Sequence, residues 1–327
     1  MIAVELIRAL VAEAALAPSV HNVQPARWRF ADGNVTLFED RGRRLPAGDP
    51  EGRDAATSLG AAAEGMAIAC AGHGLTLIDR GPAGGAPEGD LQPVRAFAIE
   101  PGGTADPLGA FVAGRRSWRG AFESPTEADR TAARGLAGED AIVVADADGI
   151  AAIAVLADPA SLGFLRDTGF RAELRSWMRL SRRDPRWARD GLNAEAMAMS
   201  RIEAIGAGLV LGPLFRPLDA IGLAAPLTGE AATIRGSAAV LLFHRPAGKA
   251  RFDSGRAFHR LWLRVTAAGL DGAVMAALAD DAACAAALAA RFGVPAGRTL
   301  ISTMRIGRAP AGAAYPRARL AVEELLV

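Results

Sequence analysis

The chain has 327 residues, enough for one large domain or two and for a substantial apolar core. Its 37 Lys and Arg residues balance 36 Asp and Glu residues, and a formal charge of +1 gives no electrostatic reason to expect a nucleic acid or an anionic bilayer as a partner. With 51% hydrophobic and 22% charged residues, the composition is that of a folded globular protein and excludes a disordered or membrane-embedded chain.

Helix and strand patterns alternate through the first third of the chain. Apolar residues at near-helical spacing predict a helix over 2–16 that ends before Pro18. Residues 28–30 and 35–38 flank Asp32-Gly33-Asn34, a good hairpin signal. The pattern then predicts a polar loop (40–53), a long helix of small residues (55–72) and two strands (75–78 and 94–99). The alanine and glycine content of the 55–72 helix allows close approach of a second helix, so we expect it to be buried centrally.

The rest of the chain repeats this alternation after about residue 105. The predicted elements are a helix (125–136), a strand (142–145), several helices (160–235), a strand (238–243), two helices (252–269 and 280–291) and a last strand (299–306). The 160–235 segment has no counterpart in the first third, and we interpret it as a lid over a site. Its arginine run from Arg171 to Arg189, interleaved with Trp177 and Trp187, resembles a nucleic-acid stacking surface, but the interspersed acidic residues favour a solvated helical face.

The cysteines and the first residues of the sequence favour a cytoplasmic location. Cys70 and Cys284 lie far apart in alanine-rich stretches, which predicts small buried side chains and no disulfide framework. Glu5 and Glu13 stand where a secretory leader would be basic. No apolar run reaches the ~20 residues that cross a bilayer. We therefore expect a cytoplasmic protein without membrane contact.

A short uncharged loop near the start, residues 17–25, combines two prolines with three polar side chains. Pro18 and Pro25 restrict its two ends, and Ser19, Asn22 and Gln24 offer donors and acceptors at spacing too irregular for one helix or strand face. Taken alone, the loop is typical of a helix-to-strand connection that caps itself. As a binding element it suits a flat neutral heterocycle better than a phosphate.

Two arginine pairs could form an anion site. Arg115-x-Ser117-x-Arg119 would aim two guanidinium groups and a hydroxyl the same way from an extended segment, and Arg317-x-Arg319, after Pro316, repeats the spacing. Each pair alone is more often a surface charge cluster. Together they would bind a phosphate monoester. The chain has no Walker loop, dinucleotide fingerprint or Gly-x-Ser-x-Gly elbow, and its four histidines lack metal-ligand spacing.

The loop Pro18-Ser19-x-x-Asn22-x-Gln24-Pro25 resembles the flavin-contacting loop of the nitroreductase family. With Asp40, Arg44, Asp49-Pro50 and Gly52-Arg53, the longer run is similar to the long, internally fused branch of that family, which includes mycobacterial-type proteins thought to sequester FMN. The resemblance implies an α+β fold, a nitroreductase-like α-β-α sandwich duplicated into a pseudo-dimer within one chain. The halves would be residues 1–104 and 105–327, with the lid at 160–235 in the second.

The resemblance also implies where FMN would be held. Pro18, Ser19, Val20, Asn22 and Gln24 would contact the isoalloxazine ring and its edge; Arg115, Ser117, Arg317 and Arg319 the phosphate; and Arg119 the N1/C2 carbonyl edge. Residues 269–277 resemble the loop whose backbone N–H groups face flavin N5 and the C4 carbonyl, here Ala276 and Ala277. The family usually has Trp after Gln-Pro, whereas this chain has Ala26, with Trp28 two residues further on.

Because the ring loop occurs only in the first half and the arginine motifs only in the second, we expect one FMN per chain, and a monomer or a weak homodimer. The function implied is hydride transfer from NAD(P)H, through flavin N5, to a nitro, quinone or similar small-molecule acceptor, with no side chain identified as catalytic and no metal. The alternative is an FMN-binding or sequestering protein with a closed pocket and little turnover. A scaffold without any cofactor is the third hypothesis.

Overall fold

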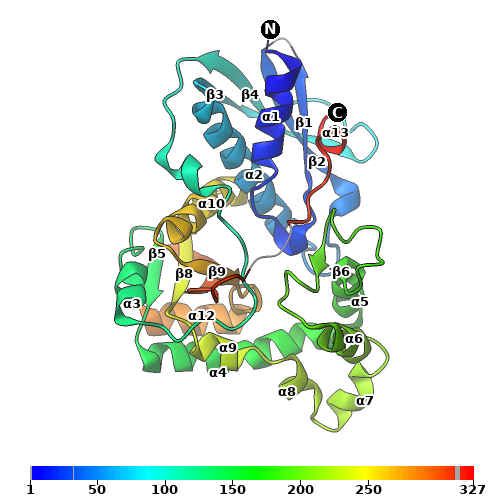
Figure 1. The fold of residues 1–327 in the computed structure, drawn as a ribbon, viewed down its shortest axis with the longest axis vertical. Coiled ribbons are helices and arrows are strands. Elements are labelled where there is room, and N and C mark those ends of the chain that lie inside the picture. The colour runs from blue at the N-terminus through cyan, green and yellow to red at the C-terminus, as the bar shows by residue number, and fades with distance from the viewer. Residues whose placement is uncertain (1, 32, 314–316) are drawn as a thin grey trace.

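The structure, a computed structural model, describes residues 2–31, 33–313 and 317–327. Asp32 of the expected hairpin turn and Pro316 of the late arginine motif lie outside these ranges. Two four-stranded antiparallel sheets, each covered by helices, form the two parts of the molecule (Figure 1). The expected α+β class is therefore confirmed.

The first sheet is built from residues near the N-terminus. Its elements, in chain order, are α1 (Val4–Ala14), β1 (Ala26–Ala31), β2 (Asn34–Asp40), α2 (Arg53–Gly72), β3 (Leu75–Pro82) and β4 (Leu91–Pro101). The strands lie in the order β1-β2-β4-β3. Trp28, Leu37 and Phe97 point from the sheet into a core that α1 and α2 complete with Leu10 and Met66.

The second sheet has the same plan. Its elements are α3 (Glu127–Arg134), β5 (Ala141–Val144), β8 (Ala239–Pro246), α10 (Arg251–Ala267), β9 (Asp271–Val274) and β10 (Arg298–Gly307), and its strands lie in the order β5-β8-β10-β9. In both sheets, therefore, the first, second, fourth and third strands along the chain are neighbours, and the long helix lies between the second and the third.

Helices cover both faces of the second sheet. Along β8, Leu241 and Phe243 pack with α10, whereas Val240 and Leu242 pack on the opposite side. That opposite side is covered by α4 (Ala147–Arg166), α9 (Ala231–Arg235), α11 (Ala277–Asp280) and α12 (Ala282–Phe292). Burial on both faces explains why β8 reads as a continuous apolar run. The second half is thus an α-β-α sandwich.

Helices α2 and α10 pack against each other, and two glycines lie at their contact. A Cβ on Gly60 would lie 1.8 Å from the Phe252 carbonyl oxygen, and a Cβ on Gly255 would lie 2.0 Å from the Thr57 carbonyl oxygen. Only glycine permits backbones to approach this closely. The 55–72 helix is indeed central, as its small residues predicted, and it joins the two sheets.

Helix α4 runs past the start of the expected lid and leads into it. It is long and apolar enough to cross a membrane by length and composition alone, contrary to the expectation from the sequence, although 44% of that apolar window is buried inside the protein. Its Ile150, Ile153 and Ala157 belong to the core beneath the second sheet. These contacts are those of a core helix in a globular protein.

The expected lid, residues 160–235, consists of short elements at one end of the molecule (Figure 1). After α4 come α5 (Thr168–Trp177), the paired strands β6 (Met178–Arg179) and β7 (Leu192–Asn193), α6 (Arg201–Val210), α7 (Phe215–Ala220), α8 (Ala224–Thr228) and α9. The segment has its own small core, which includes Leu165, Leu211 and Phe215.

The C-terminal segment returns to the first sheet. After residue 317 it runs to α13 (Val322–Leu325), and Leu320 and Leu325 enter the first core beside Trp28. The Val327 N–H donates to the Trp28 carbonyl oxygen at 3.0 Å. The last residues therefore complete the core that the first residues begin (Figure 1).

Candidate functional site: a cavity between the two halves

A cavity of about 860 Å³ lies where the first half, the second half and the lid meet. Its walls include residues 18–22, 115–117, 274–278 and 317–319, together with much of the lid. This volume is within the range of small-molecule and cofactor sites, roughly 300–1,000 Å³. Eleven of the twelve residues expected to hold FMN line it: Pro18, Ser19, Val20, Asn22, Arg115, Ser117, Arg119, Ala276, Ala277, Arg317 and Arg319.

The loop of residues 17–25 is held in a strained backbone conformation. His21, Asn22 and Gln24 have φ values of 43°, 56° and 52°, a region that residues with a Cβ seldom adopt. Ser19 Oγ accepts a hydrogen bond from the Gln24 N–H at 3.0 Å, and Ser58 Oγ accepts one from the Val20 N–H at 3.1 Å. Ser19 makes no side-chain cap to the short helical turn that follows it, so the expected self-capping is absent; the bonds to the Gln24 and Val20 N–H groups hold the strained turn instead.

Asn22 ties the loop to two distant segments. Its side-chain N–H group donates to the carbonyl oxygens of Gly191, at 3.2 Å, and Ala318, at 3.1 Å, and its Oδ1 accepts from Arg319 at 3.0 Å. Lid, loop and C-terminal segment are thus joined at one side chain.

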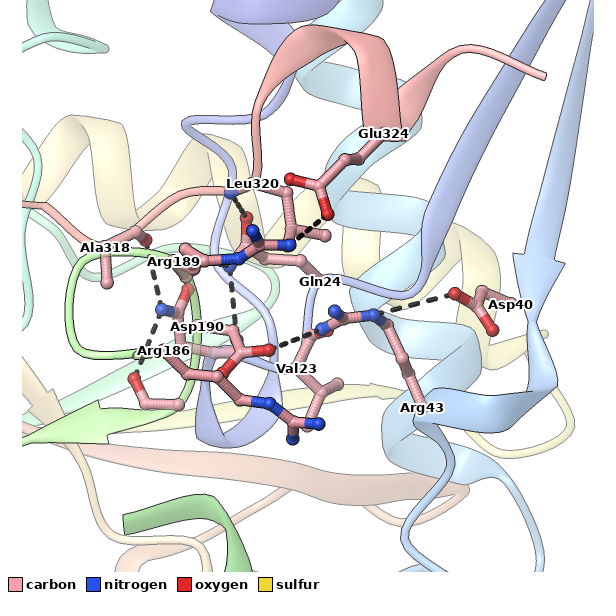
Figure 2. Close-up of polar contacts among 12 residues, drawn as sticks. Val23, Gln24, Asp40, Arg43, Arg186, Arg189, Asp190, Ala318, Leu320 and Glu324 are labelled. Atoms are coloured by element: carbon pink, nitrogen blue, oxygen red, sulfur yellow. Dashed lines mark hydrogen bonds and ion pairs between the residues drawn. The ribbon is translucent and has the colours of Figure 1, made fainter. Parts of the chain in front are cut away.

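Gln24 is the one expected ring contact that does not line the cavity. Figure 2 shows it between the Arg189 and Leu320 segments: its Nε2 donates to the Arg189 carbonyl oxygen at 2.8 Å, and its Oε1 accepts from the Leu320 N–H at 2.9 Å. Both ends of the Gln24 amide therefore bond to other segments of the chain.

The two arginine motifs converge. The Arg317 guanidinium donates to the carbonyl oxygens of Ala113 and Arg115, which places the late pair directly against the early one. Within the early motif, Ser117 forms a single bridge to Gly272 of β9, and the Trp118 N–H donates to the Gly272 carbonyl oxygen at 2.9 Å. Arginines of both motifs therefore line the same cavity.

Arg115 and Arg319 are both anchored in the cavity wall. The Arg115 guanidinium lies 4.8 Å from the centroid of the Trp262 ring and donates to the Leu16 carbonyl oxygen at 2.7 Å. Arg319 donates to the carbonyl oxygens of Ala15 and Ala318, at 2.6 and 2.7 Å, besides its bond to Asn22. Several of the five N–H donors of Arg319 are therefore hydrogen-bonded to protein oxygens.

Two polar atoms in the cavity wall have no hydrogen-bond partner within the described residues: Trp262 Nε1 and His21 Nδ1. Burial and the positive charge of Arg119 lower the pKa of His21 to about 4, so its ring is neutral at pH 7. A buried polar group without a partner costs roughly 1–3 kcal/mol. Such atoms mark this wall as one that a polar ligand would complete.

Carboxyl groups also line the cavity. Burial, reinforced by Asp280 and Asp49, raises the pKa of Asp54 to about 7, and burial raises that of Asp280 to about 6. Burial also raises the pKa of Glu230, although Arg305 and Arg119 act in the opposite direction. The cavity therefore combines arginine side chains with carboxyl groups whose pKa values are raised.

The segment expected to face flavin N5 differs from a simple loop. Residues 271–274 form strand β9, paired with β10, and only Met275 and Ala276 separate it from α11. Ala276 and Ala277 line the cavity at the start of this helix, where backbone N–H groups have no intrahelical partner.

Trp28 does not replace the missing Trp at position 26. It is buried in the first core beside the C-terminal segment and is absent from the cavity lining. Neither Ala26 nor Trp28 lines the cavity.

Several cavity residues were missed from the sequence. His21 occupies an x position of the Pro-Ser-x-x-Asn motif, and Arg116 occupies the x between Arg115 and Ser117. Trp262 belongs to the apolar pattern of a predicted helix. Ala198, whose φ is 55°, and lid residues such as Phe164 and Phe170 gave no local signal. They become neighbours only through folding.

The fold and site together define a mixed α+β protein that holds a ligand-sized, partly cationic cavity between two similarly built halves. No family model matches the chain. Among curated proteins, it is 40% identical over 83 residues to one named "Putative NAD(P)H nitroreductase acg" from Mycobacterium tuberculosis, a match that covers 25% of each chain. It is also 37% identical over 70 residues to "Putative NAD(P)H nitroreductase Rv3131" of the same organism, covering 21% of this chain and 20% of that one.

The matches span about a quarter of these relatives' length or less, and within that span they confirm the resemblance to nitroreductases stated from the motifs. Similar solved structures include the nitroreductase with bound FMN from Bacteroides fragilis, at 12% identity and a TM-score of 0.34, covering 64% of this chain and 92% of that one. Another is the FMN-dependent nitroreductase NfnB from Mycobacterium smegmatis in complex with NADPH, at 20% identity and a TM-score of 0.33, covering 65% and 89%.

Proposed function

We propose that this protein is a nitroreductase-like, FMN-dependent oxidoreductase that passes hydride from NAD(P)H to a nitro, quinone or similar small-molecule acceptor. The observation that carries the proposal is that an uncharged polar loop and two arginine motifs, far apart in the sequence, line one cavity of about 860 Å³. FMN has these two ends, a flat heterocycle with hydrogen-bonding edges and a phosphate. The relatives named as nitroreductases support the same reading.

The residues present fit FMN. Trp262 Nε1 and His21 Nδ1 lack partners among the described residues, and the arginine side chains suit a phosphate. Pro18, Ser19, Val20 and Asn22 would hold the ring, and Arg115, Ser117 and Arg317 the phosphate. Arg119 is proposed for the N1/C2 carbonyl edge, where a cation stabilises negative charge. Arg319, which like Arg317 also donates to backbone carbonyls, would reach the phosphate from the same segment and hold Asn22 of the loop.

When bound, FMN would supply the hydride chemistry at N5. The chain's own contribution would be to bind and orient: Ala276 and Ala277 offer backbone N–H groups, and the lid residues Phe164 and Phe170 restrict water. The physiological acceptor would enter the same cavity.

One observation favours the alternative, an FMN-binding protein with little turnover. Lid residues from β7, α6 and α8 line the cavity, so the lid covers the place where an acceptor would bind. Anaerobic addition of NADPH to FMN-loaded protein separates the two. Bleaching of the flavin absorbance, followed by recovery with menadione or nitrofuran, is expected of the enzyme. A flavin that stays oxidised supports sequestration.

We further propose that residues 1–104 and 105–327 are the two halves of an internal duplication that builds a single FMN site. The shared strand order and the paired glycine contacts of α2 and α10 support this division. Titration of the apoprotein should reach one FMN per chain. Two bound flavins per chain would refute the single site.

The phosphate assignment has its own test. Arg317→Ala and Arg115→Ala should each weaken FMN binding by about 1.5–3 kcal/mol, or roughly 10- to 150-fold, because a charge-assisted contact is lost. Binding of riboflavin, which has no phosphate, should change little. Arg183→Ala, on an exposed residue outside the cavity, is the matched control. Equal losses for FMN and riboflavin would place these arginines elsewhere.

A further inference from the structure

Arg305 of strand β10 is a buried cation that lies outside both arginine motifs. Its side chain is 3% exposed, and within the described ranges it forms no ion pair with a carboxylate. Burial and the charge of Arg119 lower the pKa of Arg305 to about 10, although Glu230 acts in the opposite direction, so the side chain stays charged at pH 7. A buried charge without an ion-pair partner is costly to the folded state. Stability alone therefore does not account for this arginine.

The contacts of Arg305 are with the segment that follows Ser117. Its guanidinium donates to two consecutive carbonyl oxygens, that of Arg119 at 2.6 Å and that of Gly120 at 3.1 Å. Its guanidinium carbon also lies 4.8 Å from the centroid of the Phe122 ring. A planar guanidinium can bind two acceptors at once in a fixed geometry. Strand β10 therefore holds the backbone at residues 119 and 120.

Strand β9 holds the other end of the same segment. The Trp118 N–H donates to the Gly272 carbonyl oxygen at 2.9 Å, and the Trp118 ring N–H donates to the Ala121 carbonyl oxygen at 2.9 Å. A Cβ on Gly120 would lie 2.8 Å from the Trp118 ring, so the backbone there is closely packed. The backbone of Arg119 is thus fixed on both sides.

Arg119 carries this order to the cavity. It lines the cavity, and its charge lowers the pKa of His21 on the loop and opposes the rise in the pKa of Glu230 on the lid. The rotamers open to a side chain depend on its backbone φ and ψ. Holding the carbonyl groups of residues 119 and 120 therefore limits the directions in which the Arg119 guanidinium can point.

We propose that Arg305 is a positioning residue that acts through the carbonyl groups of Arg119 and Gly120 to hold the Arg119 guanidinium against the ligand. Arg305 does not itself line the cavity. The inference rests on the proposed function, in which Arg119 lies at the N1/C2 carbonyl edge of FMN.

The midpoint potential of FMN bound to the full chain tests the proposal. A cation at the N1/C2 edge favours negative charge on the reduced flavin, so Arg119→Met should lower the potential. Arg305→Met should lower it by at least half as much, because Arg119 is then no longer held in place. The double variant should have the potential of Arg119→Met alone, since Arg305 acts through Arg119.

Arg171→Met is the matched control. Arg171 is also buried, donates to the carbonyl oxygen of Leu165, and has its guanidinium carbon 4.2 Å from the centroid of the Phe215 ring, but it does not line the cavity. Its loss should lower the free energy of unfolding, as the loss of Arg305 does, and leave the potential of bound FMN unchanged.

The outcomes separate this inference from the proposed function. A wild type that binds no FMN, or an Arg119→Met variant with the wild-type potential, overturns the role given to Arg119 and the inference with it. If FMN binds and Arg119→Met lowers the potential, an Arg305→Met variant with the wild-type potential overturns the inference alone. So does an equal decrease in Arg171→Met.

A further decrease when Arg305→Met is added to Arg119→Met would also overturn the inference, because Arg305 would then act by its own charge. Circular dichroism establishes that each variant is folded. If Arg305→Met is not, Arg305→Gln, which retains an N–H donor group, takes its place in the same cycle and should give a smaller decrease that is absent beside Arg119→Met.

Discussion

Backbone conformations that residues with a Cβ seldom adopt are concentrated at the cavity. His21, Asn22, Gln24 and Ala198 are the non-glycine residues with left-handed backbone in the described ranges, and three of the four line the cavity. Each such residue costs on the order of 1–3 kcal/mol and persists because its surroundings hold it. Strain gathered at one wall, beside polar atoms without partners, is the arrangement expected where a ligand binds.

Asp54 makes stability depend on pH. Its carboxyl has a pKa of about 7 in the folded protein, against about 4 in an unfolded chain, so the folded state retains a proton that the unfolded state releases. The retained proton adds to the free energy of unfolding below about pH 4, and this contribution is lost as the pH rises through 7. Asp54→Asn should therefore gain free energy of unfolding relative to the wild type, by about 1–3 kcal/mol at pH 8 and much less at pH 4.5.

Urea unfolding at the two pH values measures this difference. Glu51→Gln, at a neighbouring exposed carboxylate, serves as the control for removing a surface charge. A gain for Asp54→Asn that is equal at both pH values would contradict a raised pKa for Asp54.

The packing of helix α2 on helix α10 is the element-scale feature that joins the two halves. Gly60 of α2 meets the carbonyl of Phe252, and Gly255 of α10 meets that of Thr57. The contact is the same in both directions, each helix offering a glycine three residues after the carbonyl that the other glycine touches. A local twofold relation between the helices follows from this pairing.

Adding one methyl group at this crossing should separate the helices. Gly60→Ala and Gly255→Ala should each lower the free energy of unfolding by more than about 2 kcal/mol, since the new Cβ meets rigid backbone. Chemical denaturation provides the measurement. Gly72→Ala at the end of α2, where a Cβ meets nothing within 4 Å, should be neutral or slightly stabilising. Similar losses at positions 60 and 72 would mean that the crossing is not responsible.

The sequence predicted the position of most helices and strands, but it did not predict which distant segments pack against them. Periodicity identified α1, α2, α10 and β8, because each has a strong apolar pattern and ends at a glycine or proline signal. It missed the first part of α4, whose pattern is diluted by alanine, and assigned the residues of β9 to a loop. The motifs named eleven cavity residues, but the roles of Gln24 and Trp28 depend on the C-terminal segment, which no local pattern connects to them.

At the scale of the whole molecule, the C-terminal segment links the second half to the first. Leu325 packs in the first core, so Leu325→Ala should lower the free energy of unfolding by about 2–4 kcal/mol. Hydrogen exchange should show the loss of protection chiefly in β1 and β2 and not in the second sheet. Val327→Ala, at a partly exposed side chain, is the control. Uniform loss across both sheets would show that the two halves unfold only as one unit.

The same connection sets an order of events during synthesis. A growing polypeptide leaves the ribosome from its N-terminus, and domains made first generally fold first. Here the hairpin of β1 and β2 must wait, with Trp28 still accessible to water, until some three hundred further residues have emerged and Leu320 and Leu325 arrive to cover it. In the interval, Trp28 lacks the two leucines that share its core in the folded protein.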